Sequence, residues 1–131
     1  MKDERILIDT SAWIDYFKGQ NGQTMNLMDV VLSKNDIYVP KVVIAELLQG
    51  CKSEKETSFI EGFLDTFFII DNSPDTWIKA GRLSFLMKRH GKTVNLTDCY
   101  ISVIAQENNC IILTLDKHFK DIKKFLEIKL L

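Results

Sequence analysis

Four carboxylates lie at places where an α/β protein could bring them to one site. Asp9 directly follows a short apolar run, and Asp116 stands just beyond another. Asp98 opens a helical segment that precedes the second run, so it can face the same edge of a sheet. Glu46 lies within the stretch 42–48, where every neighbour is apolar. Because ligands of open α/β sheets bind beyond the carboxyl ends of the strands, these acids are candidates for one shared site.

Each of the four carboxylates also has a purely structural interpretation. Asp9 could cap a helix that begins near Ser11, and Asp98 could be a first-turn acid stabilised by the helix dipole. Asp116 could be a turn residue. Glu46 is harder to explain in this way, because a carboxylate within an apolar helix must find a partner, a metal or an exposed edge.

A cluster of these four acids would require compensation. Two carboxylates about 5 Å apart repel each other by roughly 3 kcal/mol at an effective dielectric constant near 20. A divalent cation offsets this repulsion, and oxygen ligands without histidine or thiolate favour Mg²⁺ or Mn²⁺ over Zn²⁺. One or two such ions would suit phosphodiester hydrolysis by a metal-activated water, with no covalent enzyme intermediate.

Five short apolar segments predict the strands that would position these acids. Four are unbroken runs rich in β-branched residues, the pattern of parallel strands buried on both faces. The four runs lie at 6–8, 37–39, 68–70 and 111–113, and a weaker fifth segment lies at 128–131. Helical patterns separate most of them, so the sequence predicts an α/β fold with a mainly parallel sheet.

Helix boundaries are marked by capping residues. Ser53 and Glu56 have the spacing of a capping box. An apolar stripe, interpreted here as core, follows at helical spacing: Phe59, Ile60, Phe63, Leu64, Phe67 and Phe68. Ser73 is expected to cap the next helix, with Pro74 at its first position and an end at Gly91. A further helix is expected from about Thr97 to Asn108.

Length and composition indicate an ordinary globular protein. The chain has 131 residues, 46% of them hydrophobic and 27% charged, and a formal net charge of -1. We therefore expect a single domain over 1–131, and the total charge predicts no particular partner. The cysteines, interpreted as reduced thiols, are Cys51, Cys99 and Cys110. The apolar run near the N-terminus is too short for a signal peptide or a membrane span, so we expect a cytoplasmic protein.

The segments that carry the four acids resemble those of PIN-domain proteins, especially the VapC toxins. The resemblance covers nearly the whole chain, and the four motifs occur in the family's order. They are LIDTSAWIDYF at 7–17, VIAELLQG at 43–50, LTDCYI at 96–101 and LTLDKHF at 113–119. One departure is the bulkier stretch 99–103, where many relatives continue with an alanine-rich helix.

This resemblance implies a three-layer α/β/α domain with a five-stranded parallel sheet, acting as an endoribonuclease with Mg²⁺ or Mn²⁺. The metal-binding quartet implied by position is Asp9, Glu46, Asp98 and Asp116. Thr10 or Ser11, together with Thr114, would support the quartet by hydrogen bonding. VapC-like toxins are typically homodimers that a cognate antitoxin holds inactive, so both partners are expected here.

Basic residues near the quartet are candidates for holding RNA phosphates. Lys117, His118 and Lys120 follow the last acid and are best placed. The second basic cluster, at 88–92, is more simply a solvated helix end that complements the helix dipole.

Two other classes of function compete with the nuclease interpretation. A phosphotransfer domain would need a paired acid beside Asp9, but Thr10 and Ser11 stand there, and Glu46 lies on a helix. A non-catalytic PIN scaffold that binds RNA or protein would not need all four acids. The complete quartet therefore favours the enzyme over both.

Overall fold

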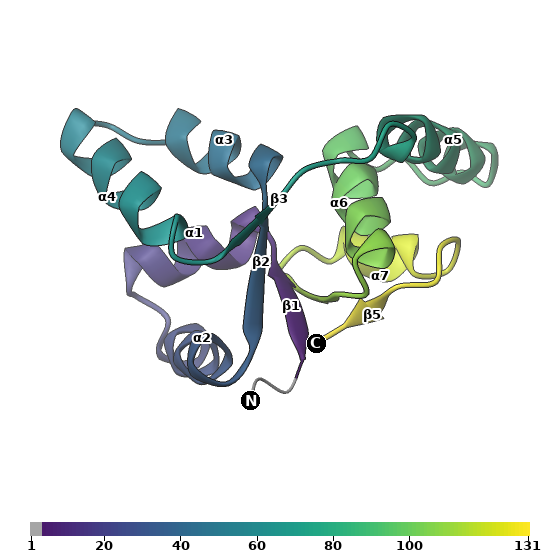
Figure 1. Ribbon diagram of the computed structural model, residues 1–131. Coiled ribbons are helices and arrows are strands. Elements are labelled where there is room, and N and C mark those ends of the chain that lie inside the picture. Colours follow the sequence, from purple (N-terminus) through teal and green to yellow (C-terminus); the bar gives the residue numbers. More distant parts are fainter. Residues whose placement is uncertain (1–3) are drawn as a thin grey trace.

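The computed structural model describes residues 4–131 and confirms the predicted fold. Five strands form one parallel sheet in the order β3-β2-β1-β4-β5 (Figure 1). The strands are β1 (Arg5–Ile8), β2 (Asp36–Pro40), β3 (Phe68–Ile70), β4 (Ile111–Leu113) and β5 (Lys129–Leu130). Ile6 of the central strand pairs with Ile37 of β2 and with Ile111 of β4. The chain thus runs outward from β1 on one side and then crosses to the other side.

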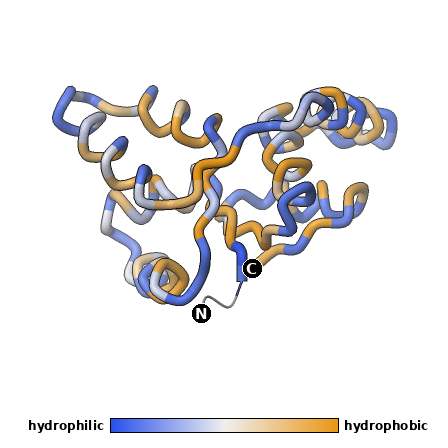
Figure 2. Tube along the Cα trace, viewed as in Figure 1, coloured by the Kyte–Doolittle hydropathy of each residue, from blue (hydrophilic) through white to orange (hydrophobic). Residues whose placement is uncertain are grey.

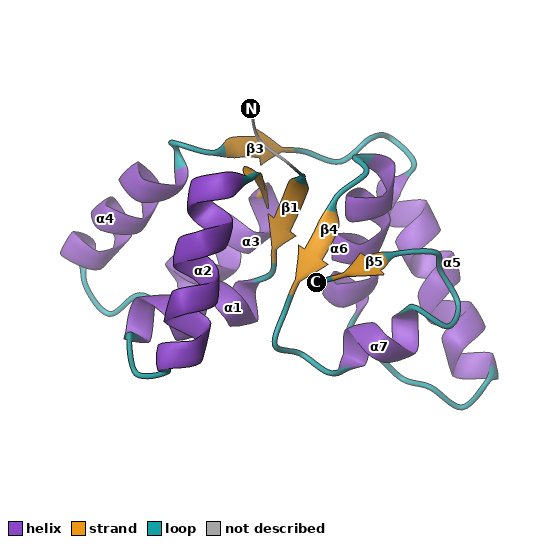
Figure 3. Cartoon of the chain, turned by 90° about the horizontal axis from the view of Figure 1, so that it is seen from below, coloured by secondary structure: helices purple, strands orange, loops and turns teal. Residues whose placement is uncertain are grey.

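The helices form a layer on each face of the sheet. The described residues contain α1 (Thr10–Lys18), α2 (Gly22–Lys34), α3 (Lys41–Gln49), α4 (Glu54–Leu64), α5 (Thr76–Arg89), α6 (Leu96–Glu107) and α7 (His118–Ile122). The first four helices lie together on one side of the sheet and the last three on the other (Figures 1 and 3). This arrangement is the predicted three-layer α/β/α sandwich.

The core lies around the central strands, as the apolar runs predicted. Leu7, Ile8 and Ile112 are completely buried. Hydrophobic segments run through the middle of the molecule, whereas many outer turns of the helices are hydrophilic (Figure 2). The edge strand β3 differs, because Phe68 keeps 54% of its surface exposed although its ring stacks on Tyr38. Burial on both faces, expected for all four runs, is therefore wrong for β3.

Helix α5 begins later than the sequence predicted. Its N-cap is Asp75, not Ser73, and Pro74 lies in the turn before the helix. The main-chain N–H of Thr76 donates to the carbonyl of Ser73 at 3.2 Å, and the Thr76 hydroxyl donates to Glu107 at 2.7 Å. These contacts close the turn and hold the helix start against α6. The predicted end is confirmed, since the helix stops at Arg89, two residues before the glycine.

Helix α4 confirms its predicted cap but is shorter than its apolar stripe. The Ser53 hydroxyl accepts from the main-chain N–H of Glu56 at 3.2 Å. The Glu56 carboxylate, however, accepts from the main-chain N–H of Lys52, not from that of Ser53 as in a complete capping box. The helix ends at Leu64, so the last two phenylalanines of the stripe lie beyond it. Phe59 is 58% exposed, and its assignment to the core is wrong.

The remaining sequence expectations concern the cysteines and the N-terminus. All three cysteines are free, and burial raises the pKa of the Cys99 and Cys110 thiols to about 11. Part of the N-terminal stretch, residues 1–3, lies outside the described residues. Among the helices from residue 4 onward, none is both long and apolar enough to cross a membrane.

Candidate active site

Asp9 lies at the end of the central strand and points into the site. It occupies the N-cap position of α1, but its side chain makes no capping hydrogen bond. Its Oδ2 instead accepts from the Ser11 hydroxyl at 2.9 Å and from the Thr114 hydroxyl at 2.8 Å. Only 4% of Asp9 is exposed. Asp9 therefore stands at the cap position, as the structural interpretation expected, but its side chain does not cap the helix.

Ser11 and Thr114 also connect the start of α1 to the loop after β4. The main-chain N–H of Leu115 donates to the Ser11 hydroxyl at 3.0 Å, and that of Asp116 donates to the Thr114 hydroxyl at 3.0 Å. The two hydroxyls lie 3.3 Å apart. The carboxylates of Asp9 and Asp116, from distant parts of the chain, are thus fixed relative to each other.

Thr10 orients the acid of α3. Its hydroxyl donates to Oε1 of Glu46 at 2.8 Å. Glu46 is partly buried on a helix that packs against α1. The sequence left open whether Thr10 or Ser11 would support the quartet, and the structure gives each hydroxyl a different carboxylate.

The pKa of Asp98 reflects the closeness of the other three acids. It lies in the first turn of α6, where the helix dipole favours a charged carboxylate. Its pKa is nevertheless raised from 3.8 to about 7, first by burial and then by the charges of Asp116, Asp9 and Glu46, with His118 opposing them. Burial and like charges therefore outweigh the dipole, and the purely structural interpretation does not account for Asp98.

Asp116 combines a turn role with a place in the cluster. Its Oδ1 accepts from the main-chain N–H of His118 at 2.9 Å, as a turn aspartate does. The same oxygen lies 3.0 Å from Nδ1 of the His118 ring. One side-chain ligand atom from each of Asp98, Asp116 and His118 lies within 4.8 Å of the others. The site therefore gathers a ring nitrogen along with its carboxylates.

The sheet order explains why these residues meet. The strand order reverses between β1 and β4, and ligand crevices of doubly wound sheets open at such a point, beyond the carboxyl ends of the strands. Asp9 follows one of these strands and Thr114 follows the other. Lys117, the N-cap of α7, and Lys120, in its last turn, are both exposed.

The donor chemistry of this site fits a divalent cation. Its oxygens come from carboxylates, and a cation between them would remove the repulsion that raises the pKa of Asp98. Hydroxyl groups hold Asp9 and Glu46 in place, as supporting residues around metal ligands do.

An apolar groove opens next to Glu46 and was missed in the sequence. It has a volume of about 770 Å³ and lies between α1, α3 and α4. Its lining includes Ile14, Phe17, Leu47, Phe59 and Ile60, with Lys18, Lys52 and Lys55 among the charged residues. Apolar residues at spacings of three and four in α4 were the available indication, but that stripe was assigned to the core.

Comparison with known proteins identifies the family. The model of the family described as PIN domain matches residues 6–125. This chain belongs to the PIN domain family. The sequence resemblance that pointed to the family is thereby confirmed, along with its three-layer fold.

Individual relatives agree with this assignment. Ribonuclease VapC1 of Methanocaldococcus jannaschii is 24% identical over 125 residues, covering 95% of this chain and 85% of that protein. The crystal structure of VapBC2 from Rickettsia felis, bound to a DNA fragment from its promoter, has a TM-score of 0.79 at 23% identity and 97% coverage of both chains. A toxin-antitoxin complex from Klebsiella pneumoniae has a TM-score of 0.70 at 22% identity, covering 85% of this chain and 86% of that one.

Proposed function

We propose that this PIN-domain protein is a metal-dependent endoribonuclease and the toxin of a toxin-antitoxin pair. The observation that carries the proposal is the convergence of the acids at one edge of the sheet. Thr114 links Asp9 to Asp116, ligand atoms of Asp98 and Asp116 lie within 4.8 Å of each other, and the neighbouring Thr10 holds Glu46. Membership of the PIN family and similarity to a protein named a ribonuclease support the same activity. Mg²⁺ or Mn²⁺, as one or two ions, is the cofactor that the oxygen donors favour.

The four carboxylates would hold the metal, and the rest of the site would orient them. When bound, a divalent cation polarises a phosphoryl oxygen and makes an attached water more acidic. Ser11 and Thr114 hold one oxygen of Asp9, and Thr10 holds one oxygen of Glu46, so each carboxylate presents its other oxygen. We assign Lys117 and Lys120 to phosphate contacts that place the RNA backbone over the acids. His118, which the sequence grouped with these two lysines, lies 3.0 Å from Asp116 instead.

Cleavage of a mixed RNA pool tests this function. Purified protein is incubated with Mn²⁺, with Mg²⁺ or with EDTA, alongside the variants Asp98→Asn and Asp65→Asn. Asp65 is an exposed acid at the end of α4, so its variant controls for the loss of one charge. Cleavage that needs both a metal and Asp98 but not Asp65 supports the enzyme. Metal binding without cleavage of any RNA in the pool would favour the non-catalytic scaffold.

The antitoxin is proposed to dock in the groove beside Glu46. The groove is apolar and carries three lysines against two acids, Glu46 and Glu56, which suits an amphipathic segment with acidic residues. Because Glu46 lines the groove, a segment bound there would reach the active site. The similar toxin-antitoxin complex supports a partner of this kind. The candidate partner is the product of a short reading frame immediately upstream of this gene, where one exists.

A pair of matched variants tests the docking site. Phe59→Ala removes an exposed ring from the groove, whereas Val30→Ala removes methyl groups from the exposed surface of α2. We expect Phe59→Ala to weaken binding to the upstream product about tenfold or more while leaving RNA cleavage intact. Equal affinity of both variants, measured by calorimetry, would place the partner elsewhere.

We also propose that the protein is cytoplasmic and that it forms a homodimer. Helix α5 exposes Trp77, Ile78, Phe85 and Leu86, each by 41% to 61%, which gives an apolar face for a second copy. Light scattering should therefore report a dimer, which Phe85→Glu converts to a monomer. A wild-type monomer at micromolar concentration would contradict the dimer without affecting the nuclease.

A further inference from the structure

The environment of His118 sets it apart from the other basic residues near the site. Its Nδ1 lies 3.0 Å from Oδ1 of Asp116, and its main-chain N–H donates to the same oxygen at 2.9 Å. The next residue, Phe119, is completely buried. The backbone at position 118 is therefore fixed on both sides, and the ring is held at the acids although its side chain is 58% exposed.

The separation between ring and carboxylate suits two ligands of one ion. With metal–ligand bonds of about 2.1 Å, neighbouring ligands on an octahedral ion lie about 3.0 Å apart, and opposite ligands about 4.2 Å apart. The Nδ1–Oδ1 distance of 3.0 Å equals the first of these values. The same distance is that of a hydrogen bond between ring and carboxylate, and the ion would take the place of the proton between them. The ligand atoms of Asp98, Asp116 and His118, all within 4.8 Å of one another, can approach a single ion with small side-chain movements.

We propose that His118 is a nitrogen ligand of the metal site and biases that site toward Mn²⁺ over Mg²⁺. The inference rests on the proposed metal-dependent function and adds a ligand to its four carboxylates. Mg²⁺ prefers oxygen and keeps several waters, whereas imidazole suits transition ions. A site with one imidazole among its carboxylates therefore discriminates between two ions that an all-carboxylate site would treat more alike.

The other histidine provides a matched control. Nδ1 of His90 lies 3.0 Å from the carbonyl oxygen of Leu86, and its ring lies edge-on to Phe125 at 5.4 Å between centroids. It is exposed at the end of α5 and belongs to a different set of contacts from His118. His90→Ala thus removes an imidazole without touching the proposed site.

The decisive experiment is a spectroscopic measurement on Mn²⁺ bound to the full chain. The protein is stripped with EDTA, dialysed at pH 8 and loaded with Mn²⁺, and electron spin-echo envelope modulation reports whether a ¹⁴N nucleus is directly coordinated. We expect the nitrogen modulation in the wild type and in His90→Ala, and its loss in His118→Ala. Free Mn²⁺, followed by its electron paramagnetic resonance signal, gives the affinity, and competition gives that for Mg²⁺.

The affinities separate this inference from its alternatives. His118→Ala should weaken Mn²⁺ binding by about 10- to 100-fold and Mg²⁺ binding by much less. Tight Mn²⁺ binding without nitrogen modulation in the wild type would overturn the inference and leave His118 as a phosphate contact. Absence of Mn²⁺ and Mg²⁺ binding by the wild type would instead overturn the proposed function itself. Because the wild-type spectrum decides the ligation, a folding defect in the variant cannot obscure the answer.

Discussion

Replacing Asp98 by Asn should stabilise the metal-free protein at neutral and alkaline pH. The folded protein raises the pKa of Asp98 from 3.8 to about 7, so folding favours its protonated form. The contribution of this group to the free energy of unfolding is therefore most favourable below pH 4. It declines as the pH rises from about 4 to about 7 and stays at its lowest value above that. Asn is neutral at every pH and lacks this decline.

The magnitude follows from the size of the pKa change. The difference between 3.8 and about 7 corresponds to about 4 kcal/mol. Because Asp98 is partly exposed, solvent screening reduces this value, and we expect about 2 kcal/mol. In EDTA at pH 8, Asp98→Asn should thus be about 2 kcal/mol more stable than the wild type. At pH 4 the two proteins should be nearly equal.

Urea denaturation in EDTA, followed by circular dichroism from pH 4 to pH 8.5, measures this difference. Asp65→Asn is the control and should follow the wild type at every pH. Saturating Mn²⁺ should reverse the order at pH 8, because a ligand at 100 times its Kd stabilises the native state by about 2.7 kcal/mol. A constant difference between Asp98→Asn and wild type across the pH range would refute the reasoning. So would a variant less stable than wild type at pH 8, since Asp98 would then make a net favourable contact.

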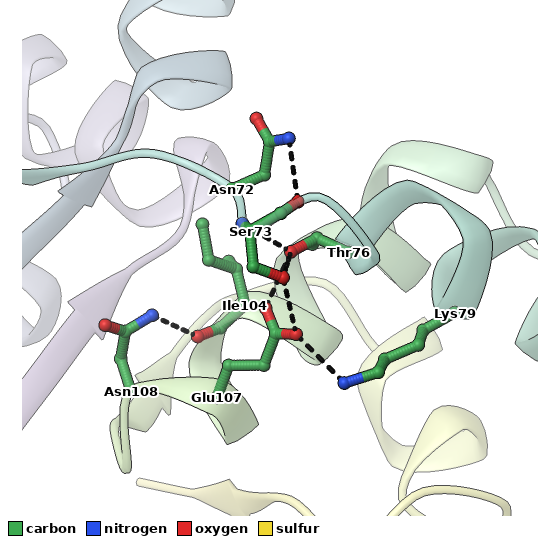
Figure 4. A network of polar contacts seen from close by, with 7 residues as sticks. All are labelled: Asn72, Ser73, Thr76, Lys79, Ile104, Glu107 and Asn108. Atoms are coloured by element: carbon green, nitrogen blue, oxygen red, sulfur yellow. Dashed lines mark hydrogen bonds and ion pairs between the residues drawn. The ribbon is translucent and has the colours of Figure 1, made fainter.

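Further predictions concern the supports of the site and the helices. Thr114→Ala removes a hydrogen bond to Asp9 and should lower RNA cleavage about 10- to 100-fold. Thr114→Ser keeps the hydroxyl and should restore cleavage in the same assay. Glu107→Ala should lower the free energy of unfolding by about 2 kcal/mol without changing cleavage, because its carboxylate accepts from three side chains, one of them fully buried (Figure 4). Lys79→Ala should cost less than about 1 kcal/mol in the same denaturation assay, because its ion pair with that carboxylate is exposed. Gly62→Ala should stabilise α4 by about 0.5–1 kcal/mol. Gly91→Ala, at a φ of +77°, should instead destabilise the protein by about 1 kcal/mol. A thermal melt should show a higher melting temperature for the first variant and a lower one for the second.

Local sequence patterns predicted most of the regular elements. All five strands were found, four from apolar runs rich in β-branched residues, which favour strands of a parallel sheet, and β5 from a weaker apolar segment. The helix at 96–107 was also predicted, from its apolar period. Helix α2 was overlooked although Asn21 caps it through two main-chain N–H groups. Helix α7, at five residues, is too short to show a period.

Long-range contacts decided what local patterns left open. The start of α5 depends on the bond from Thr76 to Glu107, 31 residues away, which no helix-capping pattern includes. The exposure of Phe59 likewise depends on how α4 sits against α1 and α3. An apolar residue at helical spacing can face either the core or an open groove. Which of these it faces depends on where the neighbouring helices lie, and the local sequence does not contain that information.

The sequence by itself determined the fold class, the family resemblance and the four candidate acids. These depend on residue types in order along the chain, which periodicity and motif spacing express directly. The tertiary structure decided which hydroxyl holds which acid and placed an imidazole beside Asp116. The physical reason lies in the sheet order, since Ser11 and Thr114 are 103 residues apart and meet only because β4 pairs with β1. The perturbed pKa of Asp98 is likewise a property of that assembly, because burial and the charges of three distant acids produce it together.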